Sequence, residues 1–315
     1  MKANVKDLVA GQEAIITGAV TVKKAKTKKK NEPYINLRIA DATGSVFINV
    51  WQDSPHFEAV SGLVDGQKIE AHVMCKDVSS YADVNLLSFQ PVQQNKEEVV
   101  DREALKNELR SIIEGMEDKQ LRSLVSNVFK RKEVIDNFFT APATLMSGYS
   151  FTGGLLAHVV RTAKLSKAIA EVANNWSFNT DSKTTKLNAD LLVCASILHD
   201  VGKILAFKQS EYRIDKTMYG ELFEDSYLTM RIINEEIEKA KLTHEKRLLL
   251  EHVIGSAKGK QGYGALHIPR TKEAILFHFI DAMDSQLANF EHLSRSSEGE
   301  LFAQLFQKTF YLGDF

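Results

Sequence analysis

Apolar side chains recur at every second position in two runs near the start of the chain. The runs are Ile35, Leu37, Ile39 and Val46, Ile48, Val50. Between them, the Asp-Ala-Thr-Gly sequence at 41–44 is a turn signal. A period of two indicates strands with one buried face, so the two runs are predicted to form a hairpin.

Three further strand-like runs lie at residues 11–22, 67–75 and 81–92, and residues 54–64 after the third strand can hold a short helix. Five strands with a short helix after the third is the order of an oligonucleotide-binding (OB) barrel. Residues 1–95 are therefore predicted to form an OB-fold domain that binds nucleic acid.

Beyond residue 102 the spacing of apolar residues lengthens to that of a helix, as Leu105, Leu109 and Ile112 illustrate. Helices are predicted at 103–116, 119–131, 154–174, 187–200, 225–241, 244–255, 271–290 and 299–309. Residues 96–102 are mostly charged and are predicted to be a linker. The expected fold class is therefore two-domain, all-β plus all-α, with a helical domain over 103–315.

The composition narrows the class of protein. The 315 residues are 44% hydrophobic, which is enough for two cores. Cys75 and Cys194 lack the spacing of a disulfide scaffold or a zinc ribbon, which fits a reducing compartment. The N-terminus has no signal-peptide core, and no apolar stretch reaches the roughly 18 residues of a membrane span. We expect a cytoplasmic protein that does not enter a membrane.

Positive charge is concentrated between the first two predicted strands, although the formal net charge of the chain is only −1. The lysines there are Lys23, Lys24, Lys26, Lys28, Lys29 and Lys30. This loop borders the binding face of an OB barrel, where ammonium groups meet phosphates. Tyr34 and Trp51 offer rings on which bases can stack. The expected partner is single-stranded RNA or DNA; the alternative is a solvated loop with ordinary barrel aromatics.

Histidine and aspartate recur on the apolar helices of the second domain. His199 and Asp200 end one predicted helix, while His158 and Asp281 lie on two others among apolar residues. Two imidazoles and two carboxylates would suit a divalent ion such as Mn, Fe, Mg or Zn. Such an ion lowers the pKa of bound water and polarises a phosphoryl oxygen. Taken singly, each residue has an ordinary explanation, since a lone histidine on an apolar helix is more often a hydrogen-bonded core residue and a His-Asp pair often occurs by chance.

The motifs GGLLAH at 153–158, LHDVGK at 198–203 and FIDAMD at 279–284 resemble those of the HD phosphohydrolase superfamily. The whole chain resembles the YhaM family, bacterial 3′–5′ exoribonucleases with an OB domain before an HD domain. The resemblance implies phosphodiester hydrolysis of single strands from the 3′ end by a metal-bound water, with Mn as the expected ion, and a homo-oligomer. It implies that the metal ligands are His158, His199, Asp200 and Asp281, and that Lys203 and Asp200 act at the scissile phosphate.

The chain departs from that family's pattern around a second metal site. Glu224-Asp225 stands where relatives carry Gly-His, Ser-Ala-Lys-Gly at 256–259 replaces Ser-His-His-Gly, and residues 146–152 contain no histidine. Asp225, His252 and Lys258 remain as candidates for a second metal or a phosphate contact. The basic loop 255–264 either closes over a substrate or is only a surface loop.

Three functions follow from these features. The first is a metal-dependent 3′–5′ exonuclease on single strands. The second is an HD phosphohydrolase acting on nucleotides, in which the barrel serves regulation or assembly. The third is a catalytically weak single-strand-binding protein with a degenerate second metal site.

Overall fold

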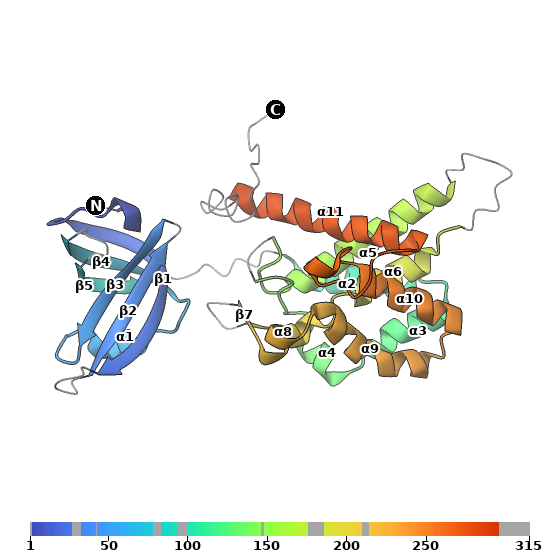
Figure 1. Ribbon diagram of the computed structural model, residues 1–315, viewed down its shortest axis with the longest axis horizontal. Helices are drawn as coiled ribbons and strands as arrows, with labels where there is room; N and C mark the ends of the chain where they lie inside the picture. The colour runs from blue at the N-terminus through green and yellow to red at the C-terminus, as the bar shows by residue number, and fades with distance from the viewer. Residues whose placement is uncertain are drawn as a thin grey trace, which may run out of the picture. The chain divides into compact units, whose positions relative to one another are not determined.

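The computed structural model describes residues 2–26, 33–41, 43–77, 83–92, 100–145, 148–175, 186–209 and 214–295. Described residues up to Val92 form one unit, and those from Val100 onward form the other (Figure 1). The first unit is built from strands and the second almost wholly from helices, as the change in apolar period predicts.

Five strands of the first unit close into a barrel in the order β1-β2-β3-β5-β4. A short helix, α1, follows β3, and a 3-10 helix precedes β1. The elements are η1 Val5–Asp7, β1 Glu13–Lys26, β2 Pro33–Asp41, β3 Gly44–Trp51, α1 Phe57–Ser61, β4 Lys68–Asp77 and β5 Asp83–Pro91. Strands β1 and β4 pair antiparallel, and β3 meets β5 in parallel, which leaves no open edge. This arrangement confirms the predicted OB barrel.

The period of two sorts the strand residues between the inside and the outside of the barrel. Ile35, Leu37 and Ile39 of β2 are fully buried, together with the alternate residues of β3 that pair with them. The intervening residues share the outer face, where Tyr34 is paired with Trp51, Asn36 with Asn49 and Arg38 with Phe47. The same alternation therefore builds the core and exposes one row of aromatic and polar side chains.

Gly18 allows β1 to pass close to β2. A Cβ at this position would come within 2.5 Å of the carbonyl oxygen of Ala40. Because that oxygen belongs to the backbone, a larger residue could not be accommodated by a side-chain rotation. A glycine within a strand commonly marks such an approach.

The second unit contains ten α-helices in its described part, with a short hairpin between α7 and α8. The elements are α2 Arg102–Glu114, α3 Lys119–Val128, α4 Lys132–Asn137, α5 Gly154–Asn175, α6 Ala189–Leu198, α7 Lys203–Ala206, β6 Phe207–Gln209, β7 Ile214–Lys216, α8 Met218–Leu222, α9 Asp225–Ala240, α10 His244–Ser256, η2 Gln261–Tyr263 and α11 Lys272–Arg295.

The long periodic helices lie where the sequence predicts them, with ends that differ by a few residues. Three helices, α4, α7 and α8, and the hairpin were not predicted, because four to six residues are too few to show a period. Gly255 and Ser256 extend α10 instead of opening a loop. The helix predicted at 299–309 lies outside the described residues.

Helix α6 is the centre of the second unit. Every residue from Leu191 to Leu198 is buried, and α3, α5, α10 and α11 all pack against it. A helix that is apolar on all sides is stable only inside a core. His199 caps the C-terminus of α6, so His199 and Asp200 emerge in the interior. Among the described residues, no helix combines the length and apolarity needed to cross a bilayer.

Candidate functional site

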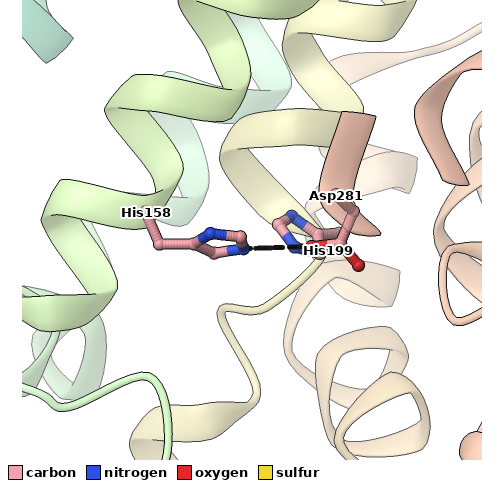
Figure 2. Close-up of side chains that lie close together, drawn as sticks. All are labelled: His158, His199 and Asp281. Carbon is pink, nitrogen blue, oxygen red and sulfur yellow. Dashed lines mark hydrogen bonds and ion pairs between the residues drawn. The ribbon is translucent and has the colours of Figure 1, made fainter. Parts of the chain in front are cut away.

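Three helices bring the predicted histidines and aspartates together. His158 comes from α5, His199 from the end of α6 and Asp281 from α11, and Figure 2 shows their side chains pointing toward one another. The Nε2 atom of His158 lies 3.2 Å from Nε2 of His199 and 3.2 Å from Oδ1 of Asp281. His199 Nε2 lies 3.5 Å from the same carboxylate oxygen. Separate segments of the chain thus converge on one point.

Asp200 places a fourth candidate ligand atom next to this cluster. Its Oδ2 atom lies 3.3 Å from His199 Nε2 and 3.6 Å from His158 Nε2. At most 5% of each of the four residues is exposed. The structure therefore brings together all four residues that the motifs single out: His158, His199, Asp200 and Asp281.

The donor atoms of this cluster fit a divalent metal ion. Asp200 Oδ2 and Asp281 Oδ1 are buried and lack a hydrogen bond of good geometry, although Lys203 Nζ lies 2.6 Å from Asp200 Oδ2. Buried carboxylate oxygens that are incompletely satisfied are unfavourable, since they have left water. A cation between them and the two imidazoles would satisfy all four atoms. Mixed nitrogen and oxygen ligands suit Mn, Fe, Mg or Zn.

The charges of the cluster are strongly coupled. Burial lowers the pKa of His199, but the carboxylates of Asp200 and Asp281 outweigh it and raise the pKa to about 9. Burial also acts to raise the pKa of both carboxyl groups, yet neighbouring cations hold each pKa well below its usual range. Both aspartates therefore stay ionised at neutral pH, and His199 holds a proton that a metal ion would displace.

Outer hydrogen bonds orient the two imidazoles. His199 Nδ1 lies 2.9 Å from the carbonyl oxygen of Ser196, and His158 Nδ1 lies 2.7 Å from Oδ2 of Asp284. Each Nδ1 donates to its oxygen, which leaves Nε2 free to face the cluster. Tyr149 also donates to Asp284 at 2.7 Å, and Arg161 Nε pairs with its other oxygen at 2.9 Å.

Sequence reasoning did not assign a role to Asp284, Tyr149 or Arg161. Asp284 carried one usable signal, because it lies three residues after Asp281 and hence on the same face of the helix. Its carboxylate is fully buried, which the local pattern of α11 did not reveal. Tyr149 and Arg161 come near Asp284 only through tertiary packing.

Two lysines border the cluster. Lys203, the first residue of α7, places Nζ 2.6 Å from Asp200 Oδ2, and its side chain is 7% exposed. Lys258 follows the end of α10, and its Nζ lies 3.3 Å from Asp200 Oδ1 and 3.7 Å from Asp281 Oδ2. Each carboxylate is therefore in contact with at least one ammonium group.

The remaining candidates, Asp225 and His252, are placed differently. Asp225 begins α9, and its charge is one of those that raise the pKa of Lys258 against the effect of burial. His252 Nε2 accepts a hydrogen bond from the backbone N–H of Arg270 at 3.0 Å. With Gln261 it lines a separate pocket. His252 is not among the clustered residues His158, His199 and Asp281.

The barrel carries an exposed aromatic row on β2 and β3. The rings of Tyr34 and Trp51 are 5.0 Å apart, and 42% of Trp51 is exposed. Phe47 lies two pairs along on the same face with the guanidinium of Arg38 5.9 Å from its ring, and neither was predicted. The period of two was the available signal, since positions 47 and 51 must share a face.

Of the lysines predicted to bind nucleic acid, only Lys23 has a side chain among the described residues. Lys23 is exposed and pairs with Asn36 in the β1–β2 ladder. Lys24 and Lys26 also lie in β1, but their side chains are outside the described part of the structure, as are Lys28, Lys29 and Lys30 entirely.

Comparison with known proteins finds relatives of the helical segment and of the chain as a whole. Residues 155–286 match the family model of the HD domain, a segment that contains all four clustered residues. A protein named 3′-5′ exoribonuclease YhaM from Listeria monocytogenes serotype 4b (strain CLIP80459) is 25% identical over 307 residues, covering 90% of each chain. A protein of the same name from Geobacillus sp. (strain WCH70) is 24% identical over 296 residues, covering 89% of this chain and 86% of its own.

Among solved structures, a domain of replication protein A from Methanococcus maripaludis is 18% identical to this chain. The match covers 30% of this chain and 98% of the replication protein A domain, with a TM-score of 0.24.

Proposed function

Since the chain is a divergent member of the YhaM family, we propose that it is a metal-dependent 3′–5′ exonuclease that shortens single-stranded RNA or DNA. The observation that carries this proposal is the convergence of two imidazoles and two carboxylates, with two buried carboxylate oxygens that lack a hydrogen bond of good geometry. The name of the relatives, 3′-5′ exoribonuclease, supplies the reaction and its direction.

In this proposal His158, His199, Asp200 and Asp281 hold one divalent ion, with Mn as the expected metal and Mg, Fe or Zn as alternatives. When bound, such an ion lowers the pKa of a coordinated water and polarises the scissile phosphoryl oxygen. Lys203 keeps Asp200 oriented through their 2.6 Å ion pair and offers a positive charge to the phosphate. Asp284 keeps the ring of His158 in position.

The outer face of the barrel holds the strand in this proposal. Trp51 and Phe47 are each 42% exposed, so bases can stack on their rings. Arg38 of β2 and Lys23 of β1 lie on the same outer face and can meet phosphates. The lysines of the β1–β2 connection extend this charge in the sequence. Base stacking and phosphate contacts do not depend on the base sequence. This face can therefore bind strands of varied sequence, as an enzyme that trims varied strands requires.

The test is a time course on a 5′-labelled single strand, as RNA and as DNA, with Mn added. Wild type is compared with Asp200→Asn, which removes a ligand charge, and with Asp136→Asn, a control on the surface of α4. We expect wild type and the control to give a ladder that shortens from the 3′ end. Asp200→Asn should bind the strand without shortening it.

Two other results would contradict this proposal and favour one of the alternative functions. Release of small products from nucleotides, with oligonucleotides left intact, would make the protein a nucleotide phosphohydrolase. A salt-sensitive gel shift without any turnover would make it a single-strand-binding protein. The cluster of two histidines and two aspartates, with the hydrogen bonds that orient its imidazoles, favours a catalytic centre over a protein that only binds single strands.

We also propose that the chain forms a homo-oligomer and works in the cytoplasm. Helix α11 exposes a row of large apolar side chains at four-residue spacing, namely Ile275, Phe279, Met283 and Leu287. Large apolar patches on a protein surface commonly mark an interface. Cys75 and Cys194 are buried and are not joined in a disulfide, which fits a reducing compartment.

A further inference from the structure

Lys258 is a largely buried ammonium surrounded by carboxylates. Its side chain is 24% exposed, and its Nζ approaches Asp200 Oδ1 at 3.3 Å and Asp281 Oδ2 at 3.7 Å. Asp225 is a third carboxylate whose charge acts on it. An ammonium leaves water at this depth only when negative charge replaces its hydration.

The two aspartates divide their oxygens between two positions. Asp200 Oδ2 and Asp281 Oδ1 face the histidine pair, with Lys203 Nζ also 2.6 Å from Asp200 Oδ2, whereas Asp200 Oδ1 and Asp281 Oδ2 face Lys258. A carboxylate that bridges two cations in this way is what a centre with two metal ions requires. Here the second position contains the Nζ of a lysine.

The backbone around Lys258 is tightly held. Gly259 has a φ of +75°, and a Cβ there would come within 2.2 Å of the ring of His278. His278 Nδ1 donates to the carbonyl oxygen of Ala257 at 2.8 Å, which ties the turn to α11. The residues on both sides of Lys258 are therefore fixed against the helix that carries Asp281.

We propose that the Lys258 ammonium takes the place of a second metal ion, so that this centre holds a single divalent ion. The inference rests on the proposed metal site. A second divalent ion would have to share Asp200 and Asp281 with a fixed positive charge, and repulsion opposes this. His252, another candidate ligand, already accepts a hydrogen bond from the backbone N–H of Arg270.

The test is a titration of the metal-free full-length protein with Mn²⁺ alone, followed by calorimetry and by metal analysis after dialysis. Wild type should bind one ion per chain. Lys258→Met, which keeps the length of the side chain without its charge, should bind a second ion through the freed oxygens of Asp200 and Asp281, with the negative charge of Asp225 acting on the same position. Lys258→Arg and the exposed neighbour Lys260→Met should both bind one ion.

Thermal unfolding gives a second measurement that checks the fold of each variant. Without metal, Lys258→Met should unfold at a lower temperature than Lys258→Arg, because three carboxylates lose their counter-charge, and Mn²⁺ should remove the difference. Two ions in wild type, or one ion in both wild type and Lys258→Met, would overturn the inference.

Neither measurement uses nucleic acid, so the two proposals can fail separately. One ion in wild type and two in Lys258→Met, without cleavage of any strand, would leave the inference standing and remove the exonuclease. Cleavage by a wild-type protein that holds two ions would do the reverse.

Discussion

At the scale of single residues, His199 links the charge of the centre to pH. Asp200 and Asp281 raise its pKa to about 9 although burial opposes them, so the metal-free protein carries a proton on His199 at neutral pH. A metal ligand must offer a free nitrogen, and binding therefore releases that proton. The same two aspartates thus attract either a metal ion or a proton.

Manganese binding should accordingly tighten as the pH rises toward 9. At pH 7 each Mn²⁺ bound should release about one proton. Calorimetric titrations in two buffers with different ionisation enthalpies measure this number directly. Binding at pH 7 without proton release would show that His199 is neutral in the metal-free protein.

The stability of the metal-free protein should fall as the pH rises, whereas its binding of Mn²⁺ tightens. The folded-state pKa of His199 lies above its ordinary value of 6.5, so the native state holds more protons than the unfolded state between 6.5 and about 9. The stabilisation is complete below pH 6.5 and is lost as the pH rises through about 9. Thermal unfolding in EDTA across this window checks the sign, and added Mn²⁺ should suppress the decline.

At the scale of elements, short distances between backbones fix where the proposed ligands lie. Gly202 joins α6 to α7, and a Cβ at this position would lie 2.4 Å from the backbone nitrogen of Thr229 and 2.7 Å from the carbonyl oxygen of Asp225. Its own N–H donates to the hydroxyl of Thr229 at 3.0 Å. The turn that carries Asp200 and Lys203 therefore rests directly on α9.

Gly202→Ala should destabilise the protein by about 1–3 kcal/mol, because the backbones of the turn and α9 must separate. It should also weaken Mn²⁺ binding, since Asp200 moves with the turn. Gly262→Ala is the matched control, as a Cβ there meets nothing within 4 Å, and its effect should stay within about 0.5 kcal/mol. Urea unfolding measures both; equal effects of the two substitutions would contradict this account.

The β2–β3 face makes a separate prediction about binding. Trp51→Ala or Phe47→Ala should weaken binding of a single-stranded oligonucleotide by about 1–3 kcal/mol for each base that loses its stacking partner. Val64→Ala, which truncates an exposed apolar residue of the same unit, should leave affinity unchanged. Fluorescence anisotropy at fixed salt gives the comparison, and unchanged affinity in both aromatic variants would place the strand elsewhere.

At the scale of the whole molecule, the outer face of α11 is suited to contact a second copy. Phe279 and Leu287 lie four residues on either side of Met283 and are 64% and 49% exposed, while Met283 itself is 40% exposed. A row that is symmetric about one residue can pack against itself antiparallel across a two-fold axis. The opposite face of α11 carries Asp281 and Asp284, so the same helix would serve both the centre and the interface.

A cysteine placed on that axis should cross-link two chains. Met283→Cys is expected to form a covalent dimer under mild oxidation, because the two thiols would meet. Wild type should not, since Cys75 and Cys194 are buried. Val172→Cys, at an exposed position of α5, is the control. If light scattering shows an oligomer that Met283→Cys does not cross-link, another surface forms the interface.

The sequence by itself determined the two fold classes and the identity of the four central residues. A strand shows one face at every second residue and a helix at every third or fourth, so residues 35–39 and 46–50 reveal the barrel, and Leu105 to Ile112 reveal the change to helices. The three motifs were recognisable because each is contiguous.

Only the tertiary structure decided how those residues work together. His158, His199 and Asp281 come from helices far apart in the chain, and no local period reports that their ligand atoms converge. The contact of Lys258 with Asp200 and Asp281, the separate pocket of His252 and the buried partnership of Asp284 with His158 likewise depend on packing between segments. Local sequence specifies periodicity and chemistry, whereas the pairing of distant charges is fixed only when the core closes around them.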